Sequence, residues 1–140
     1  MTKKIFDILA GLTLLFAVAA PLQAGSILNH EMTVTVGFEF AAGDKLLPAG
    51  EYTVRLNSER GTVVLRGEGQ KPLMLLTARK ESRSTPQRGK LVFQRYGTSF
   101  FLNEVWGKDN SVGQTLAPSA REKEMAREKQ PQQILVVLAR

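Results

Sequence analysis

The chain has 140 residues, a formal net charge of +6 and no cysteine. The lack of cysteine excludes disulfide bonds, thiol catalysis and cysteine-based zinc sites. The length indicates a single domain that can bury enough apolar surface to fold alone.

The N-terminal segment has the layout of a secretory signal peptide. Two lysines near the start are followed by an apolar run over residues 8–20, and Ala24 and Ser26 are small residues after which a signal peptidase could cut. The run is too short for a membrane-spanning helix, which needs about 20 apolar residues. We expect residues 1–24 to be removed and residues 25–140 to form one β-rich domain in the periplasm or outside the cell, with no membrane span.

The rest of the chain predicts short β-strands separated by turns. Apolar and polar residues alternate over residues 33–40, which indicates a strand with one buried face. Pro48-Ala49-Gly50 has turn chemistry, and alternation resumes over residues 52–56. Further strands are predicted over residues 62–66, 73–78, 91–96, 99–106 and 134–138.

The clearest hairpin joins residues 91–96 to residues 99–106 through Gly97-Thr98. A two-residue turn predicts the pairs Arg95–Phe100, Phe93–Leu102 and Leu91–Glu104. One face then carries Leu91, Phe93, Phe100, Leu102 and Trp106. The other face carries Val92, Tyr96, Phe101 and Val105. A strand pair that is apolar on both faces lies inside a two-layer fold or presents one face to a partner, so these last four residues are a candidate apolar partner surface.

Near the C-terminus the sequence predicts one short helix and a last strand. Ser119 is the expected N-cap, and Glu122 three residues later completes a capping box. The helix is mostly charged, so we expect it on the surface. Residues 134–138 are apolar throughout, which favours a strand paired inside a sheet rather than at its edge. About seven short strands predict an all-β fold, either an antiparallel sandwich or a small barrel.

Parts of the mature chain resemble a known family. The stretches Val36–Val54 and Lys90–Trp106, with the charged segment Ser119–Ala126, resemble a family of small exported bacterial all-β proteins of unknown function. This resemblance implies no activity, ligand or site residue. Separately, Leu47–Tyr52 is similar to the turn that opens a strand in transthyretin-like and immunoglobulin-like extracellular modules, which favours a sandwich.

The sequence contains no recognisable catalytic motif. His30 is the only histidine, and we expect it to be solvated near the new N-terminus rather than part of a metal site. No cofactor, metal or enzymatic activity is expected. Glu104 is the one carboxylate that the predicted register places among apolar side chains, so it is either an ion-pair partner or the general acid of a hydrolase. The candidate partners for the ion pair are Arg55, Arg66 and Arg95.

Basic residues are concentrated in residues 79–95, which carry a net charge of +5, equal to that of the whole mature chain. The basic residues are Arg79, Lys80, Arg83, Arg88, Lys90 and Arg95. Such a cluster attracts anions, and in an exported protein an anionic envelope component or another envelope protein is a more suitable partner than nucleic acid.

Three functions follow from these features. The leading hypothesis is a non-enzymatic exported domain that binds a partner or has a structural role. The first alternative is a small-molecule or lipid carrier whose apolar hairpin lines the cavity of a β-barrel. The third is a hydrolase that uses Glu104.

Overall fold

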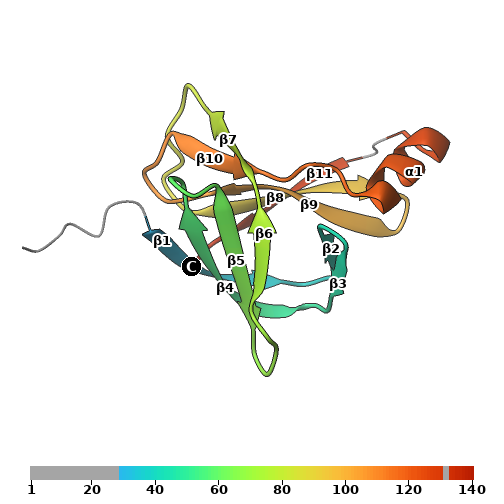
Figure 1. Ribbon diagram of the computed structural model, residues 1–140, viewed down its shortest axis with the longest axis horizontal. Coiled ribbons are helices and arrows are strands. Elements are labelled where there is room, and N and C mark those ends of the chain that lie inside the picture. Colours follow the sequence, from blue (N-terminus) through green and yellow to red (C-terminus); the bar gives the residue numbers. More distant parts are fainter. Residues whose placement is uncertain (1–28, 131–132) are drawn as a thin grey trace, which may run out of the picture.

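The computed structural model describes residues 29–130 and 133–140 (Figure 1). The predicted signal peptide, residues 1–24, lies outside the described residues. The fold is all-β, as predicted, with two sheets and, in the described residues, one short helix. The described strands do not close into a barrel, so the sandwich is the correct alternative of the two.

The first sheet is antiparallel and has four strands. Their order is β1 (Asn29–Val36), β4 (Gly50–Asn57), β5 (Thr62–Gly67) and β6 (Leu73–Leu76). The predicted alternation in β4 is confirmed, because Tyr52, Val54 and Leu56 are buried while the residues between them are partly or fully exposed. Tyr52 also donates its hydroxyl hydrogen bond to the carbonyl of Pro48, which fastens the predicted turn to the start of β4.

The second sheet contains the hairpin and the C-terminal strand. Its order is β11 (Gln133–Leu138), β8 (Lys90–Tyr96), β9 (Ser99–Trp106), β10 (Val112–Thr115) and β7 (Ala78–Glu81). Two further strands lie beside this path, since β2 (Phe40–Ala42) pairs with both β9 and β3 (Lys45–Leu47). The structure therefore has more strands than the seven predicted. Strands of three or four residues, such as β2, β3, β7 and β10, are too short to show a clear period in the sequence.

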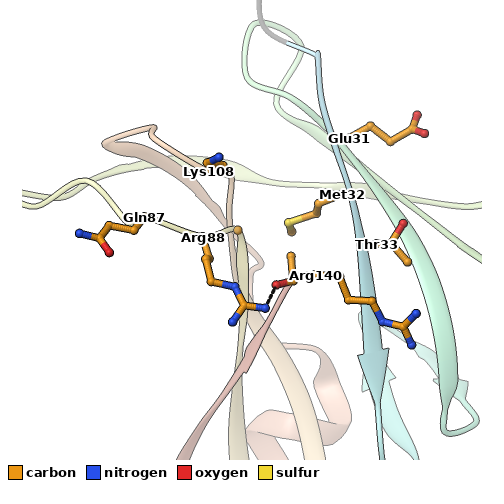
Figure 2. A pocket seen from close by; sticks show the side chains of 9 residues that line it. Glu31, Met32, Thr33, Gln87, Arg88, Lys108 and Arg140 are labelled. Carbon is orange, nitrogen blue, oxygen red and sulfur yellow. Dashed lines mark hydrogen bonds between the residues drawn. The ribbon is translucent and has the colours of Figure 1, made fainter.

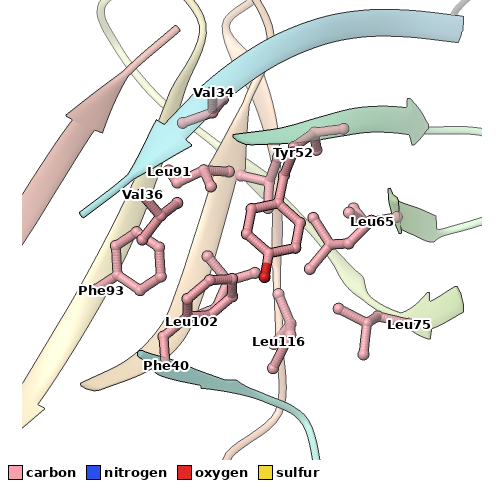
Figure 3. Packing of buried hydrophobic residues seen from close by; sticks show 14 of the residues in the cluster. Val34, Val36, Phe40, Tyr52, Leu65, Leu75, Leu91, Phe93, Leu102 and Leu116 are labelled. Carbon is pink, nitrogen blue, oxygen red and sulfur yellow. The ribbon is translucent and has the colours of Figure 1, made fainter. Parts of the chain in front are cut away.

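The core lies between the two sheets (Figure 3). Val34, Val36 and Tyr52 of the first sheet face Leu91 and Phe93 of the second, and all five are almost fully buried. Phe40 of β2 packs at one side of this layer, with ring centroids 5.4 Å from Tyr52 and 5.2 Å from Phe93. Edge-to-face contacts of this kind add to the stability that burial itself provides.

The β8–β9 hairpin follows the predicted register near its turn only. The pairs Arg95–Phe100 and Phe93–Leu102 are confirmed. The pair Leu91–Glu104 is wrong, because a β-bulge leaves Asn103 without an opposite residue, and Leu91 then pairs with Val105. One extra residue turns every later side chain to the other face. Glu104, Val105 and Trp106 therefore change face.

Val105 and Trp106 are the two apolar residues that the bulge moves to the opposite face. Val105 is fully buried in the core between the sheets. Trp106 lies on the outer face of the second sheet, where it packs against Gly113 and its indole nitrogen donates to Glu104. The predicted faces were wrong for both residues because a bulge has no periodic pattern by which it can be recognised.

Helix α1 (Ala120–Glu128) begins as predicted, with the Oγ of Ser119 accepting the backbone N–H of Glu122 at 3.2 Å. The helix lies over one end of the outer face of the second sheet (Figure 1). There Met125 contacts a small cluster of Ala41, Tyr96 and Phe101.

Strand β11 lies at an edge of the second sheet and pairs only with β8. The prediction of an interior strand was therefore wrong. The run is apolar on both sides, but only Leu135 and Val137 pack against the core, while Ile134, Val136 and Leu138 are exposed. An unbroken apolar run cannot distinguish burial from an apolar surface.

Candidate binding pocket between β1 and β8

A pocket of about 650 Å³ opens between β1 and the segment that leads into β8 (Figure 2). Four segments that are distant in the sequence line it: β1, the loop before β8, the loop after β9, and the residues after β11. We refer to it as the β1–β8 pocket. Its charged side chains are Glu31, Arg88, Lys108 and Arg140.

Backbone hydrogen bonds position the residues after β11 within this pocket. The N–H of Ala139 donates to the carbonyl of Gly89 at 2.7 Å, which extends the β8–β11 pairing by one residue. The N–H of Arg140 donates to the carbonyl of Thr33 in β1 at 3.1 Å. The end of β11 therefore connects the two sheets, and this connection forms one wall of the pocket.

Gly89 is needed at the base of the pocket because of close packing. A Cβ at this position would lie 2.4 Å from the sulfur of Met32. The lack of a side chain lets Met32 lie directly against the backbone, so the base of the pocket is apolar while its rim is charged.

Arg88 carries the charge that is least compensated. Its guanidinium donates to the carbonyl of Ala139, a neutral group, and it forms no ion pair with any residue that the structure describes. A guanidinium has five N–H donors, so Arg88 keeps donors for a further acceptor. Its positive charge is therefore available to a ligand.

Among the other charged side chains of the pocket, Lys108 adds most to this positive character. Glu31, the one acidic side chain among the described lining residues, is bound to Arg55 outside the pocket at 2.8 Å. The side chain of Lys108 is 70% exposed, and its amine lies 4.0 Å from the carboxylate of Asp109. Arg140 binds Glu51 at 3.2 Å. These are exposed pairs of small energy, and Lys108 can exchange its partner for a ligand at little cost.

The predicted basic cluster of residues 79–95 does not exist as one cluster. Arg79 and Lys80 lie in β7, Arg83 and Arg88 in the loop that follows, and Lys90 and Arg95 in β8, so the six side chains have different surroundings. Arg88 alone lines the β1–β8 pocket. Arg83 is exposed in the loop, and Arg79 lies 3.6 Å from Glu81.

The remaining three basic residues of that segment have partners elsewhere in the fold. Lys80 forms an ion pair with Glu104, and the amine of Lys90 lies 5.7 Å from the centroid of the Trp106 ring. Arg95 donates to the carbonyl of Gly97 at 2.6 Å and lies over Phe100. All three basic side chains therefore interact with groups of the second sheet.

Glu104 has a structural explanation. The bulge places it on the outer face of the second sheet, where one carboxylate oxygen pairs with Lys80 and the other accepts the indole N–H of Trp106 at 2.8 Å. The expected partners Arg55, Arg66 and Arg95 were wrong, because they were inferred from a register without the bulge. We call Lys80, Lys90, Glu104 and Trp106 the Trp106 cluster.

The candidate apolar partner surface is not exposed. Val92, Tyr96 and Phe101 are at most 9% exposed, and Val105 lies in the core between the sheets. Helix α1 covers the Tyr96–Phe101 pair, whose ring centroids are 5.7 Å apart. Tyr96 and Phe101 therefore pack against the helix, and Val105 is part of the core.

Glu122 joins the helix to this region as a buried acid. Burial raises the pKa of Glu122 above its usual value, and a hydrogen bond with Tyr96 acts in the opposite direction. Burial, together with the nearby charge of Glu122, also raises the pKa of Tyr96. The capping pattern identified Glu122, but nothing in the sequence indicated its contact with Tyr96.

His30 is not the solvated residue that the sequence suggested. It is half-buried, its Nε2 lies 3.2 Å from the side-chain nitrogen of Asn110, and its ring packs against Gly107. His30 thus fixes β1 to the loop after β9. Among the residues that the structure describes, no three His, Asp or Glu side chains are grouped as a metal site would require.

Comparison with known proteins found no matching family model, no matching curated protein and no matching solved structure. The family resemblance noted in the sequence therefore stays a prediction. In the described part of the chain, no helix has the length and apolar character needed to cross a membrane.

Proposed function

We propose that this protein is an exported, non-enzymatic β-sandwich that binds an anionic group of a cell-envelope component in the β1–β8 pocket. One observation carries this proposal. Arg88 has no carboxylate partner within the described residues, and Glu31, the acidic side chain that also lines the pocket, is bound to Arg55.

The chemistry of the pocket favours phosphate or carboxylate oxygens. Arg88 presents a planar guanidinium that can donate two parallel hydrogen bonds to such a group. Lys108 adds an exposed positive charge, and the net charge of the chain attracts anions over a longer range. Since the pocket is open to solvent, binding should weaken as the salt concentration rises.

The two alternative functions have less support. The hairpin side chains that would line the cavity of a carrier pack into the core or under α1. The two oxygens of Glu104 both have partners, so an ion pair explains this residue without catalysis. No feature of the described residues favours either alternative over anion binding.

The test compares Arg88→Gln with Arg83→Gln, a matched variant that loses the same charge from the same loop but lies outside the pocket. We expect Arg88→Gln to weaken the binding of inorganic phosphate by about tenfold, because a hydrogen bond to a charged group contributes about 1.5–3 kcal/mol. Arg83→Gln should have less than a twofold effect. Isothermal titration calorimetry measures both.

The outcome that contradicts the proposal is equal binding by the two variants. Circular dichroism checks that Arg88→Gln is folded. Vesicles with and without an anionic phospholipid then show whether the phosphate group is recognised on a lipid or only free in solution.

A further inference from the structure

The contact between His30 and Asn110 requires a neutral imidazole. The side-chain oxygen of Asn110 accepts the backbone N–H of Val112 at 2.9 Å, so the side-chain nitrogen is the atom that faces His30, at 3.2 Å from Nε2. An amide nitrogen only donates hydrogen bonds. Nε2 must therefore accept, and the proton of the neutral ring lies on Nδ1. Protonation of Nε2 would place two N–H donors against each other.

This contact helps to hold the loop after β9 in an unfavourable conformation. Asp109, the residue before Asn110, has a φ of 54°, in the left-handed region that residues with a side chain rarely adopt. Such a conformation persists where the surrounding contacts impose it. The N–H of Asp109 donates to the carbonyl of Pro86 at 2.8 Å, and the next side chain, that of Asn110, contacts His30. Loss of the His30 contact would therefore let the loop relax.

The same loop is connected to both cations of the β1–β8 pocket. Lys108, which lines the pocket, directly precedes Asp109. Pro86, which accepts the N–H of Asp109, lies two residues before Arg88, whose charge has no carboxylate partner in the described residues. Release of the loop from His30 would therefore loosen the placement of the two groups that we expect to bind the anion.

The surroundings of His30 in the described structure offer its charged form no acidic partner. The charged side chains of the adjacent elements pair with one another, namely Glu31 with Arg55 and Lys108 with Asp109. Leu56, opposite His30 in β4, is apolar, and Gly107, against which the ring packs, has no side chain. The amide of Asn110 is therefore the group that responds when the imidazole gains a proton.

We infer that the His30–Asn110 contact is a pH-sensitive latch, and that protonation of His30 releases the loop that carries Lys108 and weakens anion binding in the β1–β8 pocket. Histidine is the side chain that ordinarily changes its charge between about pH 5 and pH 8. The pocket is then complete at neutral pH and loosened in acid. The effect on binding rests on the proposed function, whereas the latch itself does not.

The first test is NMR spectroscopy, which the presence of a single histidine makes direct. At about pH 8 the ¹⁵N shifts of His30 should show Nε2 without a proton. The hydrogen-exchange protection factor of the Asp109 amide, which is corrected for the direct effect of pH on exchange, should fall at least about tenfold when the pH is lowered to about 5.5.

Asn110→Asp is the informative variant. It keeps the oxygen that accepts the N–H of Val112, and it gives a protonated Nε2 a carboxylate to which it can donate. The Asp109 amide should therefore keep its protection in acid. Asn103→Asp is the matched control, because it adds the same charge at a residue that forms no hydrogen bond with His30 in the described structure, and it should behave as the wild type.

The second test is calorimetry with sulfate, whose charge does not change in this pH range. The sulfate affinity of the wild type should fall about threefold between about pH 8 and about pH 5.5, whereas that of Asn110→Asp should change less than about 1.5-fold. Burial also raises the pKa of Glu122, but this residue is the same in both proteins, so the difference between them reports on the latch.

Three results would overturn the latch. These are a proton on Nε2 in the neutral ring, a wild-type protection factor that does not depend on pH, and the same acid-induced loss in Asn110→Asp as in the wild type. A sulfate affinity that rises in acid would show that the charge of His30 acts directly on the ligand, and would also contradict the inference. A pH-dependent protection factor without sulfate binding at either pH would confirm the latch and overturn the proposed function, together with the effect of the latch on binding.

Discussion

The β1–β8 pocket and the Trp106 cluster both contain basic residues from the same short segment, but they use them differently. In the Trp106 cluster the cations have partners within the fold, with Lys80 on Glu104 and Lys90 over the indole ring. In the pocket, Arg88 has only a neutral carbonyl. A cation with an internal partner contributes to packing, whereas a cation without one is available to a ligand. The two sites differ in whether each cation has a partner within the fold. The number of basic residues in a sequence segment does not show this difference.

The largest expected effect comes from removing the centre of the Trp106 cluster. Trp106→Ala should lower the free energy of unfolding by about 3–5 kcal/mol, because it deletes a large buried side chain and leaves Glu104 without one hydrogen bond. Urea denaturation measures this change. Arg88→Gln, the corresponding change in the pocket, should stay within about 0.5 kcal/mol of the wild type. Equal losses in the two variants would contradict the distinction.

A smaller effect should follow from crowding the same cluster. A Cβ on Gly113 would lie 2.5–2.8 Å from three atoms of the Trp106 indole. Gly113→Ala should therefore destabilise the protein by about 1–3 kcal/mol, as overpacked sites do. Gly37→Ala is the control, because a Cβ there has no atom within 4 Å. Thermal unfolding measures the stability of both variants. Equal stability of the two would contradict the close packing of Trp106 against Gly113.

The smallest expected effect concerns pH and helix α1. Because burial raises the folded-state pKa of Glu122, the folded protein favours the protonated acid. Glu122 then stabilises the fold most below the ordinary pKa of 4.5, and this contribution is lost as the pH rises through the raised folded-state value. The unfolding free energy of Glu122→Gln minus that of the wild type should therefore increase with pH across this window. A difference that is constant with pH would show that Glu122 is not held as described.

Much of the fold was predictable because it rests on local patterns. Alternation placed β4 and β9, Gly97 with its positive φ allowed the two-residue hairpin turn, and Ser119 began the helix. The strand predicted over residues 33–40 was right only in part, because β1 ends at Val36 and Phe40 belongs to β2 beside the other sheet. These signals involve residues within a few positions of one another. The bulge at Asn103 gave no such signal, and it reversed the faces of the residues that follow it.

The pocket was predictable only through Arg88. Lys108 and Arg140 belong to segments that only the packing of the two sheets brings together, so no spacing in the sequence links them. The partner of Glu31 is Arg55, which lies opposite it across the β1–β4 pairing. Whether a charge is compensated depends on such distant pairs, and this explains why the sequence overestimated the basic segment as a whole.

The most direct test of the central claim is an NMR titration of the ¹⁵N-labelled protein with inorganic phosphate at low salt. We predict that the shifted backbone amides lie around the β1–β8 pocket, at Thr33, Gly89 and Arg140, and that those of Lys80 and Gly113, beside the Trp106 indole ring, do not move. Shifts centred on the Trp106 cluster, or no localised shifts at all, would contradict the assignment of the pocket as the anion site.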